Sequence, residues 1–113
     1  MKTKDRRKSY NRIVSKSTVA NYHYVPGWFY GAHLDHIISK QTGFKHDIDP
    51  QVMGSLVNLR FITADQNIEK GTRVTSDSLS IMRIIGRSDL ADHYEPRIID
   101  APRRPRSPET DYV

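Results

Sequence analysis

Hydrophobic residues occur along this chain in short runs separated by polar and glycine-containing segments. Two runs rich in Leu, Ile, Val and Phe, at residues 33–39 and 57–62, have the composition of β-strands. The segment between them, 39–56, is punctuated by Gly43, Gly54 and an Asp-Pro pair. We therefore predict two strands joined by a long loop, and a loop of that length in a small domain is usually functional.

The second strand is followed by a sequence typical of a helix start. Thr63 and Gln66 have the spacing of a capping box, in which each side chain accepts a hydrogen bond from the other residue's backbone N–H. Gly71 can end such a helix. The order expected between residues 33 and 71 is strand, loop, strand, helix.

A second apolar stripe follows. Leu79, Met82 and Ile85 repeat at three-residue spacing, which predicts a helix that Ser76 or Asp77 caps and that ends near Gly86. A stripe of Leu, Met and Ile is expected to belong to the core rather than to a binding surface.

Near the N-terminus, Tyr10, Ile13 and Val14 have the spacing of one short helical face. The basic and polar residues 1–9 before them are predicted to be flexible, with a phosphate-contacting arm as the alternative. An aromatic-rich connector with a Pro-Gly turn signal follows at 18–31. Its aromatic rings are expected mostly to form or cover the core, and stacking on nucleic-acid bases is the alternative for one or two of them.

These elements fit in one domain. We predict that it spans residues 10–94, with its core at 33–71 and a helical turn or two at 88–94. Proline and arginine dominate residues 95–113, which predicts an extended basic tail because proline does not fit a helix interior or a central strand.

Composition narrows the function classes. Of the 113 residues 36% are hydrophobic, and 18 Lys and Arg against 13 Asp and Glu give a net charge of +5, which favours polyanionic partners. No cysteine is present, so disulfides and thiolate metal sites are excluded. Apolar runs are too short for a membrane span or a secretory signal, so a cytoplasmic protein without membrane contact is expected.

Polar residues with chemical potential lie within the predicted core. Asp35 and His36 are adjacent on the first strand, so their side chains point to opposite sides unless the strand twists or bulges. Asn67 and Lys70 share one face of the following helix. If that helix packs across the strands, a carboxylate, an imidazole, an amide and an ammonium can converge on a phosphodiester.

Each group suits one task in phosphodiester hydrolysis. His36 titrates near neutrality and can take a proton from water as a general base. Asp35 and Asn67 offer hard oxygen ligands, which suit Mg²⁺ or Mn²⁺ better than zinc. Lys70 can neutralise phosphate. Asn58, at the start of the second strand, can bridge backbone groups of the long loop and hold His36 in place.

The combined pattern resembles the HNH, or ββα-metal, nuclease family. Asp35-His36-Ile37-Ile38 resembles its first-strand motif, Asn58-Leu59 its middle asparagine, and 67–71 its closing Asn-x-x-Lys-Gly. Asparagine in the third position is similar to the HNH domains of RNA-guided CRISPR nucleases. The resemblance implies Asp35 and Asn67 as ligands of Mg²⁺ or another divalent ion, His36 as the base, Asn58 as its positioning residue and Lys70 as a phosphate or leaving-group contact.

The resemblance extends to the segment between the motifs. Gly43-Phe44, residues 48–50 and Gly54-Ser55 are similar to small HNH proteins of bacteriophages and mobile elements. It covers residues 33–71, about a third of the chain. The implied fold class is α+β, with a small ββα core of two antiparallel strands and a helix, flanking helices and extended basic tails.

The expected function is that of a metal-dependent endonuclease that hydrolyses DNA, acting in the host cytoplasm if phage-encoded. One alternative is an accessory nuclease subunit of a phage packaging or replication complex, in which a protein partner supplies specificity. Another is a non-catalytic DNA-binding protein on the same scaffold, and RNA stays open as a substrate. His33 is expected to be an ordinary, partly buried histidine, with a further metal or phosphate contact as the alternative.

Overall fold

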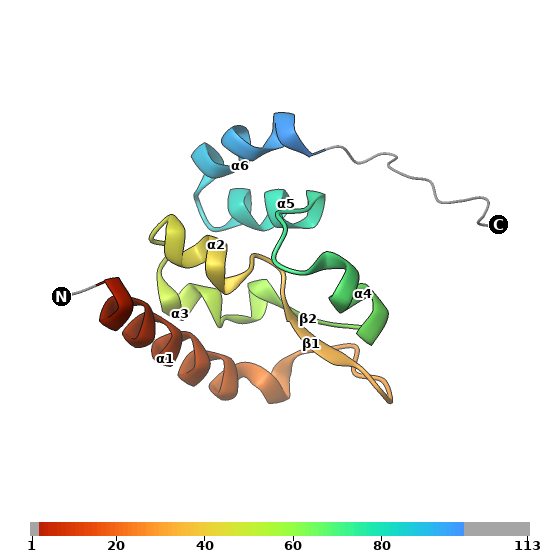
Figure 1. Ribbon diagram of the computed structural model, residues 1–113. Helices are drawn as coiled ribbons and strands as arrows, with labels where there is room; N and C mark the ends of the chain where they lie inside the picture. Colours follow the sequence, from red (N-terminus) through yellow and green to blue (C-terminus); the bar gives the residue numbers. More distant parts are fainter. Residues whose placement is uncertain (1–2, 99–113) are drawn as a thin grey trace. The chain divides into compact units, whose positions relative to one another are not determined.

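The computed structural model describes residues 3–98 (Figure 1). This part of the chain is α+β, with six α-helices and one two-stranded antiparallel sheet. None of its helices is long and apolar enough to cross a membrane. Internal contacts divide the chain into two compact units, Met1–Val74 and Thr75–Val113, where one domain over residues 10–94 was expected. The two units are described separately.

The sheet of the first unit consists of β1 (His33–His36) and β2 (Leu59–Ile62). The strands are antiparallel, with His33 opposite Ile62 and Asp35 opposite Arg60. Both lie where the sequence predicts strands, but both are shorter. A 3₁₀ turn, η2 (Leu56–Asn58), occupies the predicted start of the second strand.

Before the sheet lies α1 (Thr3–Asn21), a longer helix than expected. The prediction of a flexible segment over residues 1–9 is wrong for residues 3–9, which are helical. The hydroxyl of Tyr10 donates to the Ile48 carbonyl oxygen at 2.6 Å, and Val14 is fully buried. Two arginine side chains from the first turns of α1 also lie over the ring of Phe44, so tertiary contacts stabilise this helix.

The segment predicted as a long loop contains two short helices, α2 (Lys40–Lys45) and α3 (Pro50–Met53). Each begins at a side-chain cap: Ser39 accepts from the Thr42 N–H, and Asp49 accepts from the Gln51 N–H. The helix α3 packs beside α1 (Figure 1). The segment is therefore a folded part of the first unit rather than a free loop.

Gly54 explains how α3 and α1 approach so closely. A Cβ atom at this position would lie 2.7 Å from both the Val14 carbonyl oxygen and the Thr18 backbone nitrogen. The Gly54 carbonyl also accepts a hydrogen bond from the Asn21 side chain at 3.0 Å. Glycine here brings two backbones into contact, whereas the sequence suggested only a break between elements.

The first unit ends with α4 (Ala64–Lys70) and a short segment after it. Both hydrogen bonds of the predicted capping box between Thr63 and Gln66 are present, and Gly71 ends the helix with a φ of 55°. The prediction for this helix is confirmed. In the segment 22–32, in contrast, Tyr24, Trp28 and Tyr30 are exposed, so the expectation that the aromatic rings cover the core is wrong for them, although Val25 is buried.

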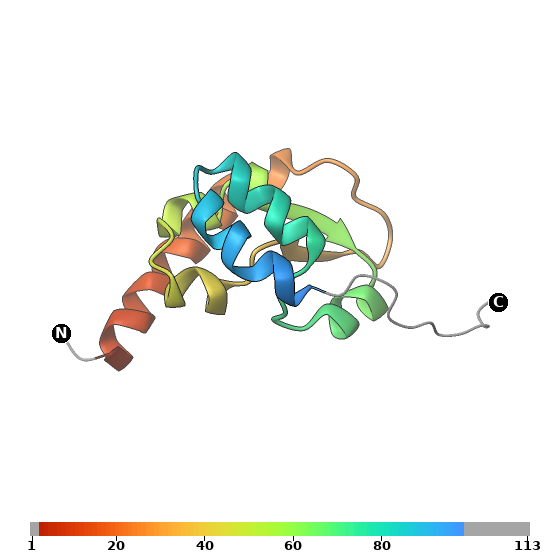
Figure 2. The ribbon, with the colours of Figure 1, turned by 90° about the horizontal axis from the view of Figure 1, so that it is seen from above.

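The second unit contains α5 (Ser76–Ile84), α6 (Ser88–Tyr94) and a final 3₁₀ turn, η3 (Glu95–Arg97). Both helices were predicted, although Thr75 caps α5 in place of Ser76 or Asp77. The two helices pack side by side, as Figure 2 shows. Most of the predicted tail, residues 99–113, lies outside the described residues.

Candidate active site

Asp35 is the centre of a buried charge cluster. It is only 5% exposed, and the register places it opposite Arg60, whose Nε donates to Oδ2 at 3.0 Å. Lys70, from α4, donates from Nζ to Oδ1 at 3.1 Å and to the His36 carbonyl oxygen at 3.0 Å. The buried Lys70 ammonium therefore ties α4 to β1, and two cations engage both oxygens of Asp35.

Asn67 lies on the same side of the sheet as Asp35. Its Nδ2 is 3.3 Å from Nδ1 of His33, and His33 shares a strand face with Asp35 because strand side chains alternate. One turn later along α4, Lys70 reaches Asp35 itself. The shared face thus carries His33, Asp35, Asn67 and Lys70, as the i, i+3 spacing on the helix predicted for the last two.

His36 points to the opposite face of β1. Its Nε2 lies 3.0 Å from the hydroxyl oxygen of Thr18, on α1. That hydroxyl donates its only hydrogen to the Val14 carbonyl oxygen at 2.7 Å, so it must accept from His36. The neutral imidazole therefore carries its proton on Nε2 and its lone pair on Nδ1.

Burial of His36 lowers the pKa of its imidazole below the ordinary value of 6.5, and the nearby positive charge of Lys40 lowers it further. The Asp35 carboxylate raises the pKa again, but less. The net effect favours the neutral form, which is the form that a general base needs.

The stability of the protein should therefore depend on the protonation of His36. Between the lowered pKa of the folded state and 6.5, the unfolded chain binds more protons, so the free energy of unfolding should rise with pH in this window and fall again on acidification. Urea unfolding in EDTA across about pH 5 to 7.5 measures this slope. His36→Gln should show a shallower slope than the parent protein, and equal slopes would contradict the lowered pKa.

Asn58 braces the backbone that follows β1. Its Oδ1 accepts from the Ile38 N–H at 2.7 Å, and its Nδ2 donates to the carbonyl oxygens of Ile38 and Met53 at 3.1 and 2.9 Å. The Asn58 carbonyl oxygen also accepts from the Ile37 N–H at 2.8 Å. The backbone bridge expected of Asn58 is present, and it ends the strand directly after His36, earlier than predicted.

The five residues singled out in the sequence therefore do not all converge. Asp35 and Lys70 are in direct contact, Asn67 shares their face, and Asn58 acts on the backbone. His36 faces away from this group, toward α1. The alternation of side chains along a strand predicts this outcome, and the strand has no bulge that would correct it.

Sequence reasoning missed two residues of this region. Arg60 lies directly opposite Asp35, which the antiparallel register would have revealed once known. Thr18 contacts His36 from a helix outside the predicted core, and the sequence carries no signal for that contact.

The donors on the Asp35 face suit a hard divalent ion in their chemistry, because a carboxylate and an amide oxygen are typical ligands of Mg²⁺. Within residues 3–98 no three His, Asp or Glu side chains form a group that could hold a metal. Asp35 and Asn67 would have to be completed by water and substrate oxygens, which Mg²⁺ tolerates. Each oxygen of Asp35 already accepts from one cation, so a bound ion would either share these oxygens with Lys70 and Arg60 or displace one of them.

Comparisons with known proteins do not add to this picture. No family model, no curated protein and no solved structure matches the chain.

Proposed function

We propose that this protein is a metal-dependent endonuclease of the HNH type that hydrolyses DNA. The observation that carries the proposal is the packing of α4 against β1, which brings Asn67 and Lys70 to the strand face of Asp35. Asn58 braces the turn after β1, and the order strand, strand, helix supports the proposal, because the HNH resemblance of the sequence implies that order.

In this proposal His36 is the general base. Its Nδ1 lone pair accepts a proton from the attacking water, whose oxygen forms a bond to phosphorus while the bond to the leaving oxygen breaks. Solvent supplies the proton that the leaving oxygen needs. His36 is the last residue of β1. In this proposal the phosphate lies across that end of the strand, where it meets His36 on one face of the sheet and Asp35 with Lys70 on the other. Thr18 holds the imidazole in the required tautomer.

Lys70 and Arg60 neutralise charge on the other side of the strand. When bound, a divalent ion held by Asp35 and Asn67 supplies Lewis-acid stabilisation of the phosphate. A side-chain cation that releases Asp35 is then available to contact a phosphate oxygen. We assign this exchange to Lys70, because its ammonium is a compact point charge on a flexible stem.

The same charge cluster favours a second candidate, a non-catalytic nucleic-acid-binding protein on this scaffold. Both oxygens of Asp35 are engaged by side-chain cations, and His36 lies on the opposite strand face. Such a protein would bind DNA without a divalent ion. An accessory nuclease subunit, whose partner supplies specificity, would cleave DNA weakly until that partner is added.

A cleavage assay separates these candidates. The purified chain is incubated with supercoiled plasmid and with single-stranded DNA and RNA, in EDTA and in Mg²⁺, Mn²⁺ or Ni²⁺. We expect nicked or linear DNA only when a divalent ion is present, and Asn67→Ala should remove the cleavage.

The matched control for Asn67→Ala is Gln66→Ala, which alters the neighbouring position of α4 and removes only an exposed cap contact. It should retain cleavage. Binding to DNA in EDTA with no cleavage under any of the three ions would contradict the nuclease assignment and favour the binding protein.

A further inference from the structure

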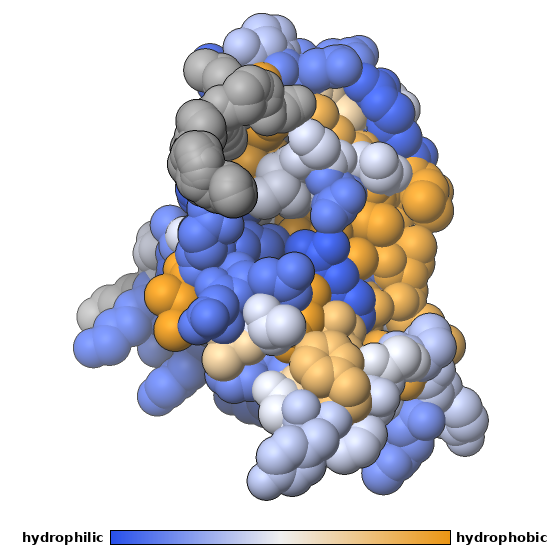
Figure 3. All heavy atoms as spheres, turned by 90° about the vertical axis from the view of Figure 1, so that its right-hand side faces the viewer, coloured by the Kyte–Doolittle hydropathy of each residue, from blue (hydrophilic) through white to orange (hydrophobic). Residues whose placement is uncertain are grey.

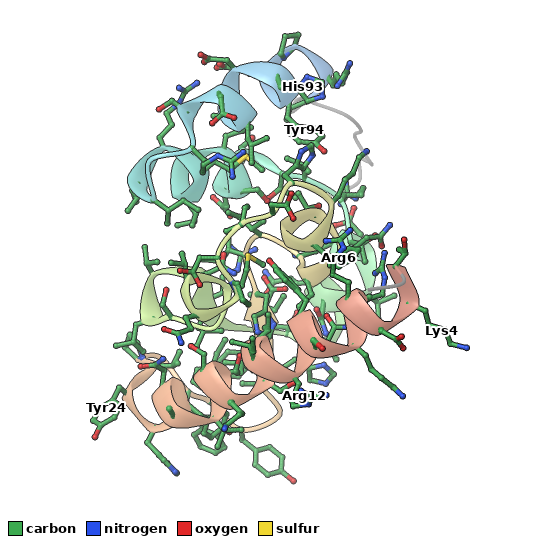
Figure 4. The ribbon with its side chains drawn as sticks, turned by 90° about the vertical axis from the view of Figure 1, so that its left-hand side faces the viewer. Lys4, Arg6, Arg12, Tyr24, His93 and Tyr94 are labelled. Atoms are coloured by element: carbon green, nitrogen blue, oxygen red, sulfur yellow. The ribbon has the colours of Figure 1, made fainter. Side chains whose placement is uncertain are left out.

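The connector between η1 (Tyr22–Tyr24) and β1 displays aromatic side chains to solvent. Tyr24, Trp28 and Tyr30 are 72%, 62% and 94% exposed. Within residues 3–98 none of their rings contacts another aromatic ring or makes a hydrogen bond. In Figure 4 the ring of Tyr24 projects away from the ribbon at the end of η1. Large rings without partners in one short segment indicate a binding surface.

The fold holds this segment in a defined shape. Tyr22 packs edge-on against Phe61 of the sheet, with ring centroids 5.9 Å apart, and Val25 is buried. Farther along, the Ala32 N–H donates to the Phe29 carbonyl oxygen at 2.9 Å, which closes a turn. The segment is therefore anchored at its beginning and closed by a turn before β1.

The closing turn explains why Tyr30 is so exposed. Gly31 has a φ of 86°, which the third position of a type II turn requires and which glycine adopts without strain. Tyr30 is then the corner residue of the turn, where its side chain points into solvent. The turn presents this ring directly before His33, whose imidazole contacts Asn67 of the candidate site.

The charge of the chain before β1 favours a polyanionic partner. From Arg6 to Leu34 the chain contains five Lys and Arg and no Asp or Glu, together with six of its aromatic residues. On α1, four exposed basic residues recur every fourth position and have no ion-pair partner within the described chain, namely Lys4, Lys8, Arg12 and Lys16. Basic side chains that track a backbone, combined with free aromatic rings, are the features of single-strand binding surfaces.

One face of the molecule shows hydrophilic and apolar side chains next to one another. In the lower part of Figure 3, pale side chains of intermediate hydropathy lie beside an orange apolar ring and blue hydrophilic groups. Exposed aromatic rings combined with basic side chains suit a nucleic-acid strand, because its bases are aromatic and its phosphates are negatively charged.

We propose that Tyr24, Trp28 and Tyr30 stack on unpaired bases, so that this protein binds nucleic-acid strands whose bases are not paired. The position of those bases beside the cleaved bond rests on the proposed function, whereas stacking itself does not. Base stacking on an aromatic ring is sequence-tolerant, since every base has a π face. The substrate class is therefore single-stranded, or branched or distorted, nucleic acid.

Trp28 makes the proposal measurable, because it is the only tryptophan of the chain. The full-length protein is titrated in EDTA and low salt with a short oligothymidine and, separately, with a duplex of the same length. We expect saturable quenching of tryptophan fluorescence by oligothymidine and at least about tenfold weaker binding of the duplex, as loss of one or more stacking contacts implies. The same titration with RNA of matched sequence shows whether the protein prefers single-stranded DNA or single-stranded RNA.

Two substitutions at Tyr30 separate stacking from apolar contact. Tyr30→Leu keeps an apolar side chain but removes the ring, and it should weaken oligothymidine binding about tenfold. Tyr30→Phe keeps the ring and should bind like the parent protein. Ile84→Ala is the matched control, because Ile84 is an exposed apolar residue of the second unit and should not contribute.

Three results would overturn the proposal. One is equal or tighter binding of the duplex with unchanged tryptophan fluorescence. Another is equal affinity of Tyr30→Leu and Tyr30→Phe. The third is tryptophan emission that changes with protein concentration alone, with dimers in sedimentation, which would assign the rings to a second copy of the chain. Since every titration is done in EDTA, quenching without any cleavage in Mg²⁺ would contradict only the nuclease assignment.

Discussion

His36→Ala should lower the rate of divalent-dependent DNA cleavage by about 100-fold or more, which is the contribution expected of a positioned general base. The alanine side chain cannot take a proton from water. The hydrogen bonds of Thr18 assign the proton of the His36 imidazole to Nε2. The lowered pKa of His36 keeps Nδ1 unprotonated near neutrality. Plasmid nicking rates at saturating Mg²⁺ measure the effect.

Thr18→Val provides the second arm of this experiment. It removes the hydroxyl that accepts from Nε2 but keeps the size of the side chain, so the imidazole loses its fixed tautomer. We expect a smaller loss of rate than for His36→Ala, with an altered pH profile. Thermal unfolding of both variants verifies that they are folded, and full activity of folded His36→Ala would remove His36 from the mechanism.

Asp35→Asn should destabilise the first unit by about 3–5 kcal/mol, because removing one partner of a buried ion pair leaves an uncompensated charge. The uncompensated charge is the buried ammonium of Lys70, which donates to Asp35 at 3.1 Å. Asparagine preserves the volume of the side chain, so little of the loss comes from packing. Urea unfolding in EDTA measures the change without a metal contribution.

A double-mutant cycle separates the cost of an unpaired buried charge from the other effects of the Asp35 substitution on stability. In Asp35→Asn combined with Lys70→Met, both charges are absent, and the apolar methionine matches the length of the lysine stem. We expect the double variant to recover much of the stability that Asp35→Asn loses. If Asp35→Asn alone unfolds at the same urea concentration as the parent protein, the ion pair contributes little to the free energy of unfolding, which would contradict this prediction.

Local signals explain the parts of the fold that the sequence predicts well. The capping box of Thr63 and Gln66 involves residues three apart, so its geometry is encoded locally, and α4 forms as predicted. The predicted i, i+3 relation between Asn67 and Lys70 follows from that helix. Asp35 and Lys70 consequently meet as the sequence suggested.

Other parts depend on contacts between distant residues, which composition does not reveal. Residues 3–9 have the composition of a solvated run, yet they are helical and arginines among them lie over Phe44. Gly43 and Gly54 read as loop residues, but a Cβ atom at either would meet neighbouring atoms at 2.7 Å, so they permit close packing. The orientation of His36 depends on Thr18, whose contact requires α1 to be folded.

The contact between Thr18 and His36 has a consequence for any excised or transplanted version of this motif. A fragment limited to residues 33–71 would retain Asp35, His36, Asn58, Asn67 and Lys70 in their original spacing. It would lack the hydroxyl that assigns the proton to Nε2, and both ring nitrogens would compete for it. A unit that fixes this tautomer must therefore reach back to Thr18, near the C-terminal end of α1, beyond the limits of the recognisable pattern.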